Sequence, residues 1–283
     1  MTVLALAPPP GTDRRSGATA APVLTFGSDG VRRRRDRLAT EEPLEIRAGG
    51  PGEAPLAVAV TMRTPGHDLE LAVGFLAAEG LLGDGARPPV AARACAQDPN
   101  VVLVALRAPL DRSRLRGRIE VSSSCGVCGH AALDELGDRC GPVADGPRVA
   151  PETLIALPDR LRDHQRLFER TGGLHAAALF DERGTLLAVR EDVGRHNALD
   201  KALGATLLAG PGAAPRPAIA MLSGRASYEL VQKAAVAGVP IVCAVSAPSS
   251  LAVDAAHRLG VTLVGFLRGE RFNVYARPDR IVL

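Results

Sequence analysis

The chain has 283 residues, of which 46% are hydrophobic, and this is enough to build one large globular domain or two moderate ones. Its formal net charge is only +3, which is too small to predict a general nucleic-acid-binding surface. Aromatic residues make up 3% of the chain and Trp is absent, so the stacking platforms of single-strand binders are scarce. We therefore expect no nucleic-acid partner, and we expect any anion to bind in a local pocket.

Cysteine usage and hydropathy favour a soluble protein of the cytoplasm. The five cysteines, at positions 95, 125, 128, 140 and 243, are an odd number and a poor disulfide framework. The N-terminal residues carry no evident export signal, because prolines and arginines interrupt them. The uncharged stretch 234–253 is broken by Gly238 and Pro240. We expect neither export nor a membrane span, and hence a cytoplasmic location.

The N-terminal part predicts a tail followed by a small lobe. Residues 1–22 are rich in Pro, Gly, Ala and Thr without apolar periodicity, which is typical of a flexible tail. The run Arg32–Arg35 is interpreted as a solvated charged face and is left out of the candidate site. Residues 23–121 mix strand-like and helix-like patterns, with strands expected at 56–60 and 101–106. This region is predicted to be an N-terminal α+β lobe.

A helix is expected between those two strands. Thr64 is a candidate N-cap before Pro65 at the first helical position. Leu69, Ala72, Val73 and Leu76 would fall on one face, and Gly80 and Gly83 offer the end of the helix, which is the amphipathic pattern of a helix packed on a sheet.

Residues 122–150 read as a long functional loop, and residues 151–283 as a more regular α/β domain. A hairpin is expected from 175–180 and 185–190 around a turn. Helices then alternate with strands; the helices are expected at 197–208, 226–237 and 250–259, and the strands at 218–222, 241–245 and 261–266. This alternation predicts a largely parallel sheet covered on both faces. Ligands should then gather beyond the carboxyl ends of the strands, near Ser223, Ser246 and Arg268.

The segment Ser122–His130 reads Ser-Ser-Ser-Cys-Gly-Val-Cys-Gly-His and carries a C-x-x-C motif at Cys125 and Cys128. A structural zinc site could use Cys140 and His130 as well, but the spacing from Cys128 to His130 is shorter than in zinc knuckles and no second C-x-x-C occurs. The position in a Gly/Ser loop also differs from that of a thioredoxin-like pair. A purely structural pair remains open, and a nucleophilic thiol with a neighbouring thiol is favoured.

Several motifs together resemble the FdhD family, the formate dehydrogenase accessory sulfurtransferases. They occur in order from about residue 40 onward, which makes the resemblance far more specific than one C-x-x-C. They are Ser122–Gly129, Thr171–His175, Glu191–Ala198, Ser223–Arg225 and Gly265–Arg271.

The resemblance implies a function and a set of partners. Members of the family are understood to accept sulfur as a persulfide from a cysteine desulfurase and to pass it to the molybdenum bis-guanine-dinucleotide cofactor, which formate dehydrogenase requires. It implies that Cys125 carries the persulfide and that Cys128 is the second thiol. It associates one segment with the cofactor, namely Phe266, Leu267, Arg268, Gly269, Glu270 and Arg271. A homodimer is implied as well.

The resemblance also implies a C-terminal domain similar to cytidine deaminase, so the expected fold class is α/β (α+β overall). The zinc of the deaminases is not expected, because His175 is followed by two alanines and the C-x-x-C lies upstream of it. We predict no tightly bound metal. The alternative function is a non-catalytic, zinc- or redox-dependent chaperone that only binds the molybdenum cofactor.

Further residues suit a ligand that carries pyrophosphate and guanine. Arg225, like Arg268 and Arg271, offers the bidentate fork that matches phosphate oxygens, and Gly224 beside Ser223 allows close approach to the main chain. Asp192 and Glu191 are expected either to accept hydrogen bonds from guanine or to shape the turn before Gly194. His175 and His196 are expected either to contact the cofactor or move protons, or to be structural.

Overall fold

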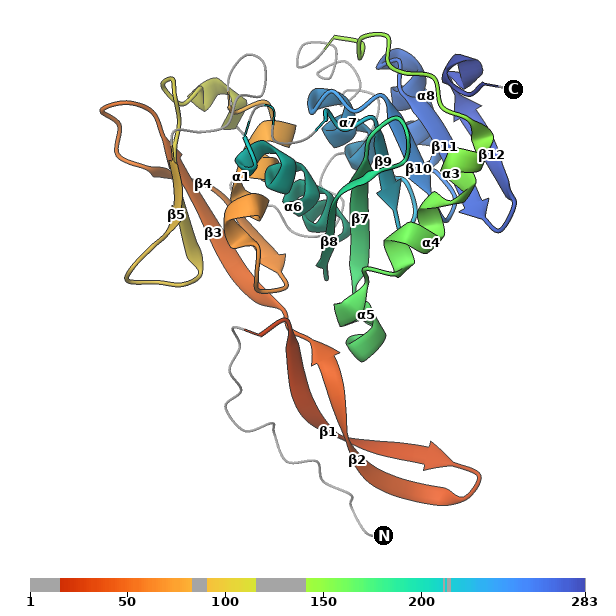
Figure 1. Cartoon of the computed structure of the whole chain (residues 1–283). Coiled ribbons are helices and arrows are strands. Elements are labelled where there is room, and N and C mark those ends of the chain that lie inside the picture. The colour runs from red at the N-terminus through yellow and green to blue at the C-terminus, as the bar shows by residue number, and fades with distance from the viewer. Residues whose placement is uncertain (1–15, 83–90, 116–140, 211, 213–214, 283) are drawn as a thin grey trace.

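The structure is a computed structural model, and it describes residues 16–82, 91–115, 141–210, 212 and 215–282. Figure 1 shows an N-terminal lobe, a larger C-terminal lobe and a long two-stranded arm that projects from the body. The arm consists of β1 (Ala18–Gly27) and β2 (Gly30–Ala39), paired antiparallel. The tail expected for residues 1–22 is therefore wrong from Ala18 onward, because this segment pairs with the arginine-rich strand β2.

The N-terminal lobe is a four-stranded sheet with one helix on it. Its strands lie in the order β4-β3-β6-β5. Their bounds are β3 (Glu42–Gly49), β4 (Leu56–Arg63), β5 (Ala91–Ala94) and β6 (Val101–Ala105), and a short 3-10 helix covers Arg112–Leu115. Leu44, Ile46 and Ala48 alternate along β3 and are fully buried with the helix α1 (Asp68–Ala78). The expected strands at 56–60 and 101–106 are confirmed.

Helix α1 lies where the sequence predicts it, but it begins later than Pro65. Gly66 and His67 both adopt positive φ angles, 106° and 59°, so the chain cannot enter a right-handed helix before Asp68. Gly80 follows the helix with a φ of 69°, which confirms its role at the helix end.

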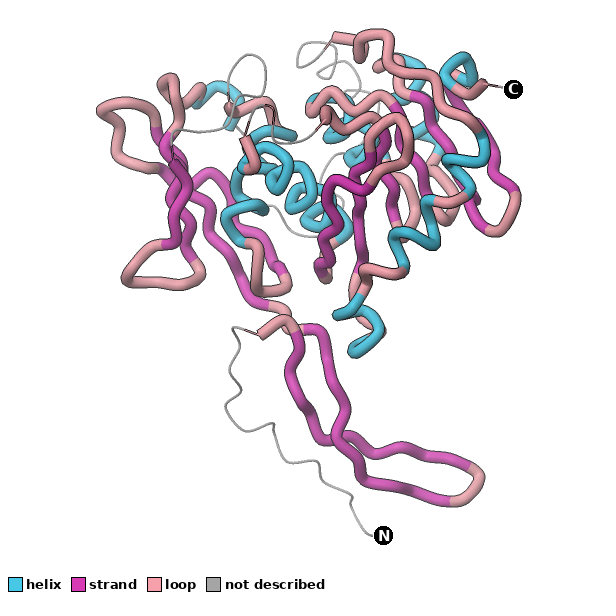
Figure 2. The backbone as a smooth tube through the Cα atoms, viewed as in Figure 1, coloured by secondary structure: helices cyan, strands magenta, loops and turns pink. Residues whose placement is uncertain are grey.

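The C-terminal lobe is built on a six-stranded sheet in the order β12-β11-β10-β9-β7-β8; Figure 1 labels these strands and Figure 2 draws them in magenta. The strands are β7 (His175–Phe180), β8 (Leu186–Asp192), β9 (Ile219–Leu222), β10 (Ile241–Ala244), β11 (Thr262–Arg268) and β12 (Arg271–Ala276). The predicted hairpin is β7–β8. The central strands β9, β10 and β11 are parallel, whereas β7, β8 and β12 run antiparallel to their neighbours. The sheet is thus mixed rather than largely parallel.

Helices cover both faces of this sheet, as predicted. One face packs against α6 (Arg195–Leu208), α7 (Tyr228–Val236) and α8 (Ser250–Arg258). The other packs against α3 (Pro151–Ile155) and α4 (Leu157–Arg162), which precede the short α5 (Arg166–Thr171). Along β9, Ala220 and Leu222 face the first layer while Ile219 and Met221 face the second. The mixed α/β class is confirmed, and no described helix is both long and apolar enough to cross a membrane.

The two lobes meet where α1 crosses α6. The crossing is close because Gly74 of α1 and Gly204 of α6 lack side chains at the contact. Buried polar groups surround it: Lys233 pairs with Asp200 at 2.9 Å and with Glu79 at 3.2 Å. Burial opposes the charge on Lys233, but these carboxylates outweigh it and raise its pKa. The lobes therefore form one continuous packed body.

An ion pair at this boundary predicts a pH-dependent stability. Glu70 of α1 accepts hydrogen bonds from Arg190 of β8 and pairs with His67 at 3.0 Å. Burial alone would raise the pKa of Glu70, but the effect of these partners is larger, and the pKa falls from 4.5 to about 2. Because the folded-state pKa is lowered, the stabilisation is present above pH 4.5 and is lost as the pH falls towards 2.

We expect Glu70→Gln to lower the free energy of unfolding at pH 7 by about 1–2 kcal/mol, with allowance for solvent screening. The deficit should shrink as the pH falls towards 2. Urea unfolding at several pH values measures it, with Glu182→Gln on the exposed hairpin turn as the control. A deficit that does not change with pH would contradict the assignment.

Candidate functional site

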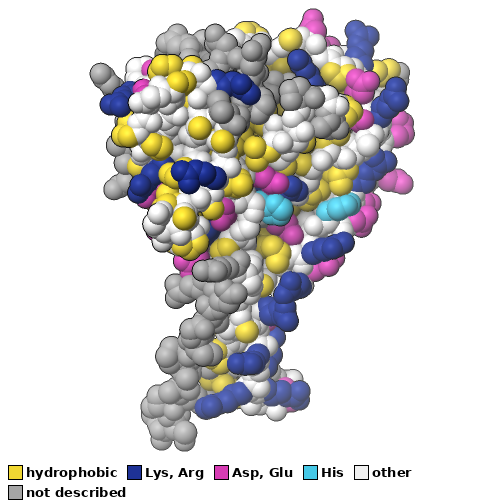
Figure 3. Space-filling view, turned by 60° about the vertical axis from the view of Figure 1, so that its left-hand side comes forward, with side chains coloured by type: hydrophobic (Ala, Val, Ile, Leu, Met, Phe, Trp, Pro, Cys, Tyr) yellow, Lys and Arg dark blue, Asp and Glu magenta, His cyan; other side chains and the backbone are white. Residues whose placement is uncertain are grey.

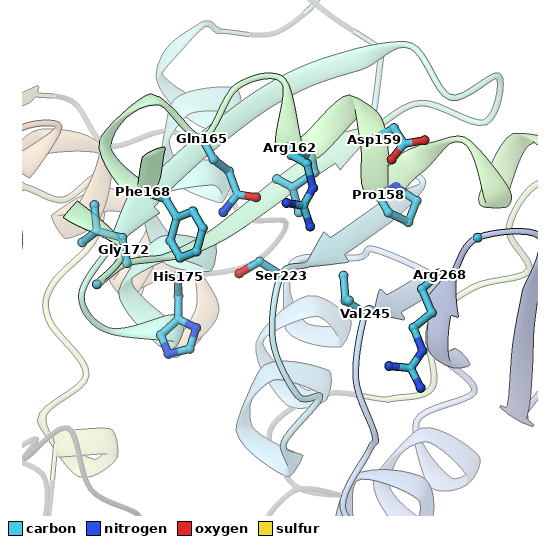
Figure 4. A pocket seen from close by; sticks show the side chains of 14 residues that line it. Pro158, Asp159, Arg162, Gln165, Phe168, Gly172, His175, Ser223, Val245 and Arg268 are labelled. Atoms are coloured by element: carbon cyan, nitrogen blue, oxygen red, sulfur yellow. The ribbon is translucent and has the colours of Figure 1, made fainter. Parts of the chain in front are cut away.

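A pocket of about 500 Å³ opens at the carboxyl ends of the parallel strands (Figure 4). The residues after β9 and β10 and the end of β11 form one side of it, and α4, α5 and the chain leading into β7 form the other. The lining residues are Pro158, Asp159, Leu161, Arg162, Gln165, Phe168, Gly172, Gly173, Leu174, His175, Ser223, Val245, Arg268 and Gly269. The position agrees with the predicted ligand edge, and the volume is in the range of pockets for small molecules.

Ser223 and His175 are fixed side by side at the centre of this edge. The hydroxyl of Ser223 accepts a hydrogen bond from the Ala176 backbone at 2.8 Å, and its own backbone N–H donates to the Ala176 carbonyl at 3.0 Å. Gly224 follows, and a Cβ built there would lie 3.3 Å from Nδ1 of His175. These two hydrogen bonds join the start of β7 to the residue after β9, and they thus hold the His175 imidazole against the backbone of Gly224.

Positive groups surround His175. Burial is the main cause that lowers its pKa, and the charges of Arg195, His196 and Arg225 lower it further. The imidazole is therefore neutral at pH 7. His196 itself pairs with Glu229 at 2.8 Å and lies 3.3 Å from the hydroxyl of Ser227. The hydrogen bond between His196 and Glu229 is the main cause that lowers the pKa of Glu229.

Arg195 and Arg225 add positive charge to this edge of the sheet, and one nitrogen of Arg195 lacks a hydrogen-bond partner in the described part of the chain. Nε of Arg195 is buried and has no hydrogen-bond partner among the described residues. Arg195 is the first residue of α6, whose first turn carries no acidic residue. The field of a helix N-terminus and these guanidinium groups all favour an anion at this edge of the sheet.

Arg268 reaches the pocket from the tip of the β11–β12 hairpin. The register of the two strands shifts between Gly265 and Arg268, and Phe266 within this irregularity has a φ of 52°. A positive φ is rare for an aromatic residue and marks a locally constrained backbone. The Phe266 ring lies 5.8 Å from the Arg268 guanidinium. The bulge thus sets Arg268 at the edge of the pocket, with the Phe266 ring beside its guanidinium and outside the pocket lining.

Residues 39–282 match the sequence model of the FdhD/NarQ family. The chain belongs to this family. A protein called "Sulfur carrier protein FdhD" from Streptomyces coelicolor is 50% identical over 272 residues, which cover 92% of this chain and 94% of the relative. Proteins with the same description from Mycolicibacterium paratuberculosis and Anaeromyxobacter dehalogenans are 50% and 49% identical, and each match covers 88% of this chain and at least 90% of the relative.

A solved FdhD/NarQ-like structure agrees with the fold. It is described as a putative formate dehydrogenase accessory protein from Desulfotalea psychrophila, and it superimposes with a TM-score of 0.74 at 26% identity. The match covers 94% of this chain and 100% of that chain. The mixed α/β fold of the family is therefore shared over nearly the whole chain.

Not every residue that the FdhD motifs suggested lies in the pocket. Leu267 is fully buried in the core beneath α3 and α4, so its side chain does not face a ligand. Glu270 and Arg271 are exposed at the hairpin, outside the pocket lining. Of this segment only Arg268 and Gly269 line the pocket; Phe266 lies outside the lining and Leu267 serves packing.

Asp192 and Glu191 have structural partners, which favours the turn-shaping alternative. Asp192 is fully buried and accepts hydrogen bonds from the backbones of Thr64 and Gly194 at 3.1 and 2.9 Å. It also pairs with Lys201 at 2.7 Å. Glu191 accepts from two backbone N–H groups at the start of α5, at 2.9 and 2.7 Å. We therefore remove Asp192 from the candidate cofactor contacts.

The thiols of the FdhD C-x-x-C motif, Cys125 and Cys128, lie outside the described residues, so their predicted roles stay predictions. Cys243 is fully buried, and burial raises the pKa of its thiol, which makes it an inert core residue. Among the residues that the structure describes, no group of three or more His, Cys, Asp or Glu side chains is placed to hold a metal.

One wall of the pocket was missed from the sequence. Helices α4 and α5 contribute Pro158, Arg162 and Phe168, the link between them contributes Gln165, and no motif pointed to these residues. The available signal was the Thr171–His175 motif, because Gly172, with a φ of 66°, ends α5 and turns the chain into β7. That motif places the helix beside the pocket, although its side chains carry no recognisable pattern.

Proposed function

We propose that this protein is a sulfur carrier that accepts persulfide sulfur from a cysteine desulfurase and transfers it to the molybdenum bis-guanine-dinucleotide cofactor, as an accessory protein of formate dehydrogenase. The cofactor is the substrate here. The observation that carries the proposal is the cationic pocket at the sheet edge, in a chain whose close relatives are named sulfur carriers.

The pocket residues suit a guanine dinucleotide. Arg268 lines the pocket, and Arg225 is close enough to His175 to lower its pKa. Guanidinium groups at these two positions suit phosphate oxygens. Gly269 leaves main chain open to close approach, whereas the space beside Gly224 is taken by the His175 ring. His175 is neutral and donates or accepts a hydrogen bond without adding charge. A dinucleotide is larger than the pocket, which would hold one part of it.

The thiols supply the sulfur step. In the proposed transfer the thiolate of Cys125 attacks the terminal sulfur of the donor's persulfide. A new S–S bond forms at Cys125 while the donor's S–S bond breaks, and the donor leaves as a thiolate. The positive groups at the pocket then attract the anionic cofactor to which the persulfide is presented.

We expect Cys125→Ala to abolish sulfur loading and sulfur-dependent activation of formate dehydrogenase. Loading is measured by cyanide-labile sulfur and peptide mass spectrometry after reaction with a desulfurase and cysteine. The matched control is Cys95→Ala, which removes a half-buried thiol of the N-terminal lobe and should retain full loading. Undiminished loading of Cys125→Ala, or stoichiometric zinc without labile sulfur in the natural protein, would contradict the carrier function.

We expect Arg268→Ala to weaken the binding of GDP, a probe for one half of the dinucleotide, by about 10-fold or more, because a charge-assisted hydrogen bond is lost. Arg271→Ala is the matched control. It removes the same charge from the residue paired with Arg268 across the hairpin, yet outside the pocket lining, and should weaken binding far less. Calorimetric titration of both variants measures this, and equal losses would place GDP elsewhere.

A further inference from the structure

The β1–β2 arm has no role in the function proposed above. Each strand has ten residues, and the ribbon extends away from both lobes (Figures 1 and 2). Its base is fixed: the backbone of Thr40 donates to Gly17 at 3.1 Å, and α5 packs against both strands. An isolated two-stranded ribbon gains little stability in water, so the outer part of the arm adds little to folding and presents its side chains to solvent.

The two faces of the arm differ in charge balance. Residues that are paired across an antiparallel ribbon share a face, and faces alternate along each strand. On one face Arg32 pairs with Asp29, and Arg34 pairs with Asp36 at 3.1 Å. This face is therefore close to neutral.

The opposite face carries arginines without acids. Val31, Arg33, Arg35 and Arg37 stand opposite Phe26, Leu24, Pro22 and Ala20 respectively. Within the described part of the chain, none of these three arginines has an ion-pair partner. Three guanidinium groups thus line one strand, beside an apolar row on the other strand.

The apolar row is exposed at its outer end, by Phe26 and Val31, and half-buried at Leu24 and Pro22. The Phe26 side chain is 71% exposed and Val31 is 48% exposed. A face that served only solubility would not place these residues in water. Aromatic and arginine side chains are instead the types enriched at protein–protein interfaces. The arm face formed by Ala20, Pro22, Leu24, Phe26, Val31, Arg33, Arg35 and Arg37, here called the arginine face, therefore fits an acidic protein surface with an apolar patch.

The arm stands next to the pocket. Helix α5 packs against β2 and also contributes Phe168 to the pocket lining, and the methyl group of Ala39 at the end of β2 lies near Gly173 of that lining. Basic side chains run along the arm up to the body in Figure 3. A protein bound to the arm is thereby held close to the pocket.

We propose that the arginine face of the β1–β2 arm docks an acidic surface of the enzyme that receives the cofactor, a formate dehydrogenase in its cofactor-free form. The inference rests on the proposed function, because it takes the pocket as the cofactor site. Nucleic acid fits the arm less well. A phosphate backbone would meet the neutralised Arg32 and Arg34 on one face and the apolar row beside the arginines on the other.

Two double variants test the inference on the full chain. Arg33→Ala with Arg35→Ala removes two arginines from the arginine face. Arg32→Ala with Arg34→Ala removes two from the opposite face, on the same strand and with the same change of net charge. Binding of cofactor-free formate dehydrogenase is measured by surface plasmon resonance at two salt concentrations.

We expect the first pair to weaken docking by about 10-fold or more and to reduce its salt dependence, and the second to change it less than about threefold. GDP affinity and labile sulfur should be unchanged in both. Equal losses from the two faces, or loss of binding to anionic vesicles or duplex DNA with docking to the enzyme intact, would overturn the inference. Failure of the natural protein to bind GDP or carry sulfur would instead overturn the proposed function, so the two failures are distinguishable.

Discussion

Gly204→Ala is expected to lower the free energy of unfolding by about 3 kcal/mol or more, since the added methyl group has no space at the crossing of α1 and α6. A Cβ built on Gly204 would lie 1.8 Å from the carbonyl oxygen of Glu70, and one on Gly74 would lie 1.7 Å from the carbonyl oxygen of Asp200. Both clashes are with backbone, so no side chain can rotate to relieve them. The helices must separate, and the buried groups around the crossing then lose their partners.

Urea unfolding of Gly204→Ala measures this loss, with Thr206→Ala on the same helix as the control. Alanine favours a helix over glycine by about 1 kcal/mol, so propensity alone predicts stabilisation. A more stable Gly204→Ala variant would therefore contradict the close crossing. The same variant should weaken GDP binding, because α6 begins at Arg195 beside the pocket and a shift of the helix displaces this cation.

The elements from β7 to β11 could be predicted because their local patterns agree with their environment, whereas α3, α4 and α5 were not predicted. Strands such as Ile241–Ala244 are buried on both faces, and the glycines at positions 238 and 260 end helices with φ angles of 75° and 66°. Strand β12 was not predicted, because Arg271, Asn273 and Val274 are exposed and give no apolar run. Its place at the sheet edge is set by pairing with β11, which is a tertiary contact.

The arm shows the limit of composition as evidence. Residues 18–22 are small and weakly patterned, and alone they resemble a disordered tail. They form part of a strand because the next segment turns back at Gly30, whose φ is 108°, and pairs with Ala18–Gly27 over ten positions. The turn Ser28-Asp29-Gly30 was the available signal. A strand depends on the segment with which it pairs, and the composition of residues 1–22 alone does not include that segment.

The candidate site could be predicted as far as chain topology determines it. Ser223 and Arg268 were expected at the ligand edge because they end parallel strands, and both line the pocket. The direction of a side chain is another matter. Leu267, adjacent to Arg268, points into the core, since neighbours in a strand face opposite sides. Motifs identify segments, whereas burial decides which residues of a segment meet a ligand.

A substitution of Asp192 tests whether its motif membership or its burial gives the correct role. We expect Asp192→Asn to lower the free energy of unfolding by about 3–5 kcal/mol, because the ammonium group of Lys201 is then buried without its counter-charge. Lys201 also donates to the carbonyl oxygen of Thr64 at 2.7 Å, so the damage would reach the boundary between the lobes.

A double-mutant cycle isolates the pair. Lys201→Met removes the other charge, and the double variant Asp192→Asn with Lys201→Met should be destabilised by less than the sum of the single variants, since neither charge is left alone. Chemical denaturation gives the three free energies. A direct contact of Asp192 with guanine predicts the opposite result: Asp192→Asn would fold with nearly natural stability and lose GDP affinity. The full burial of the carboxylate, with every described partner inside the protein, is the reason to expect loss of stability first.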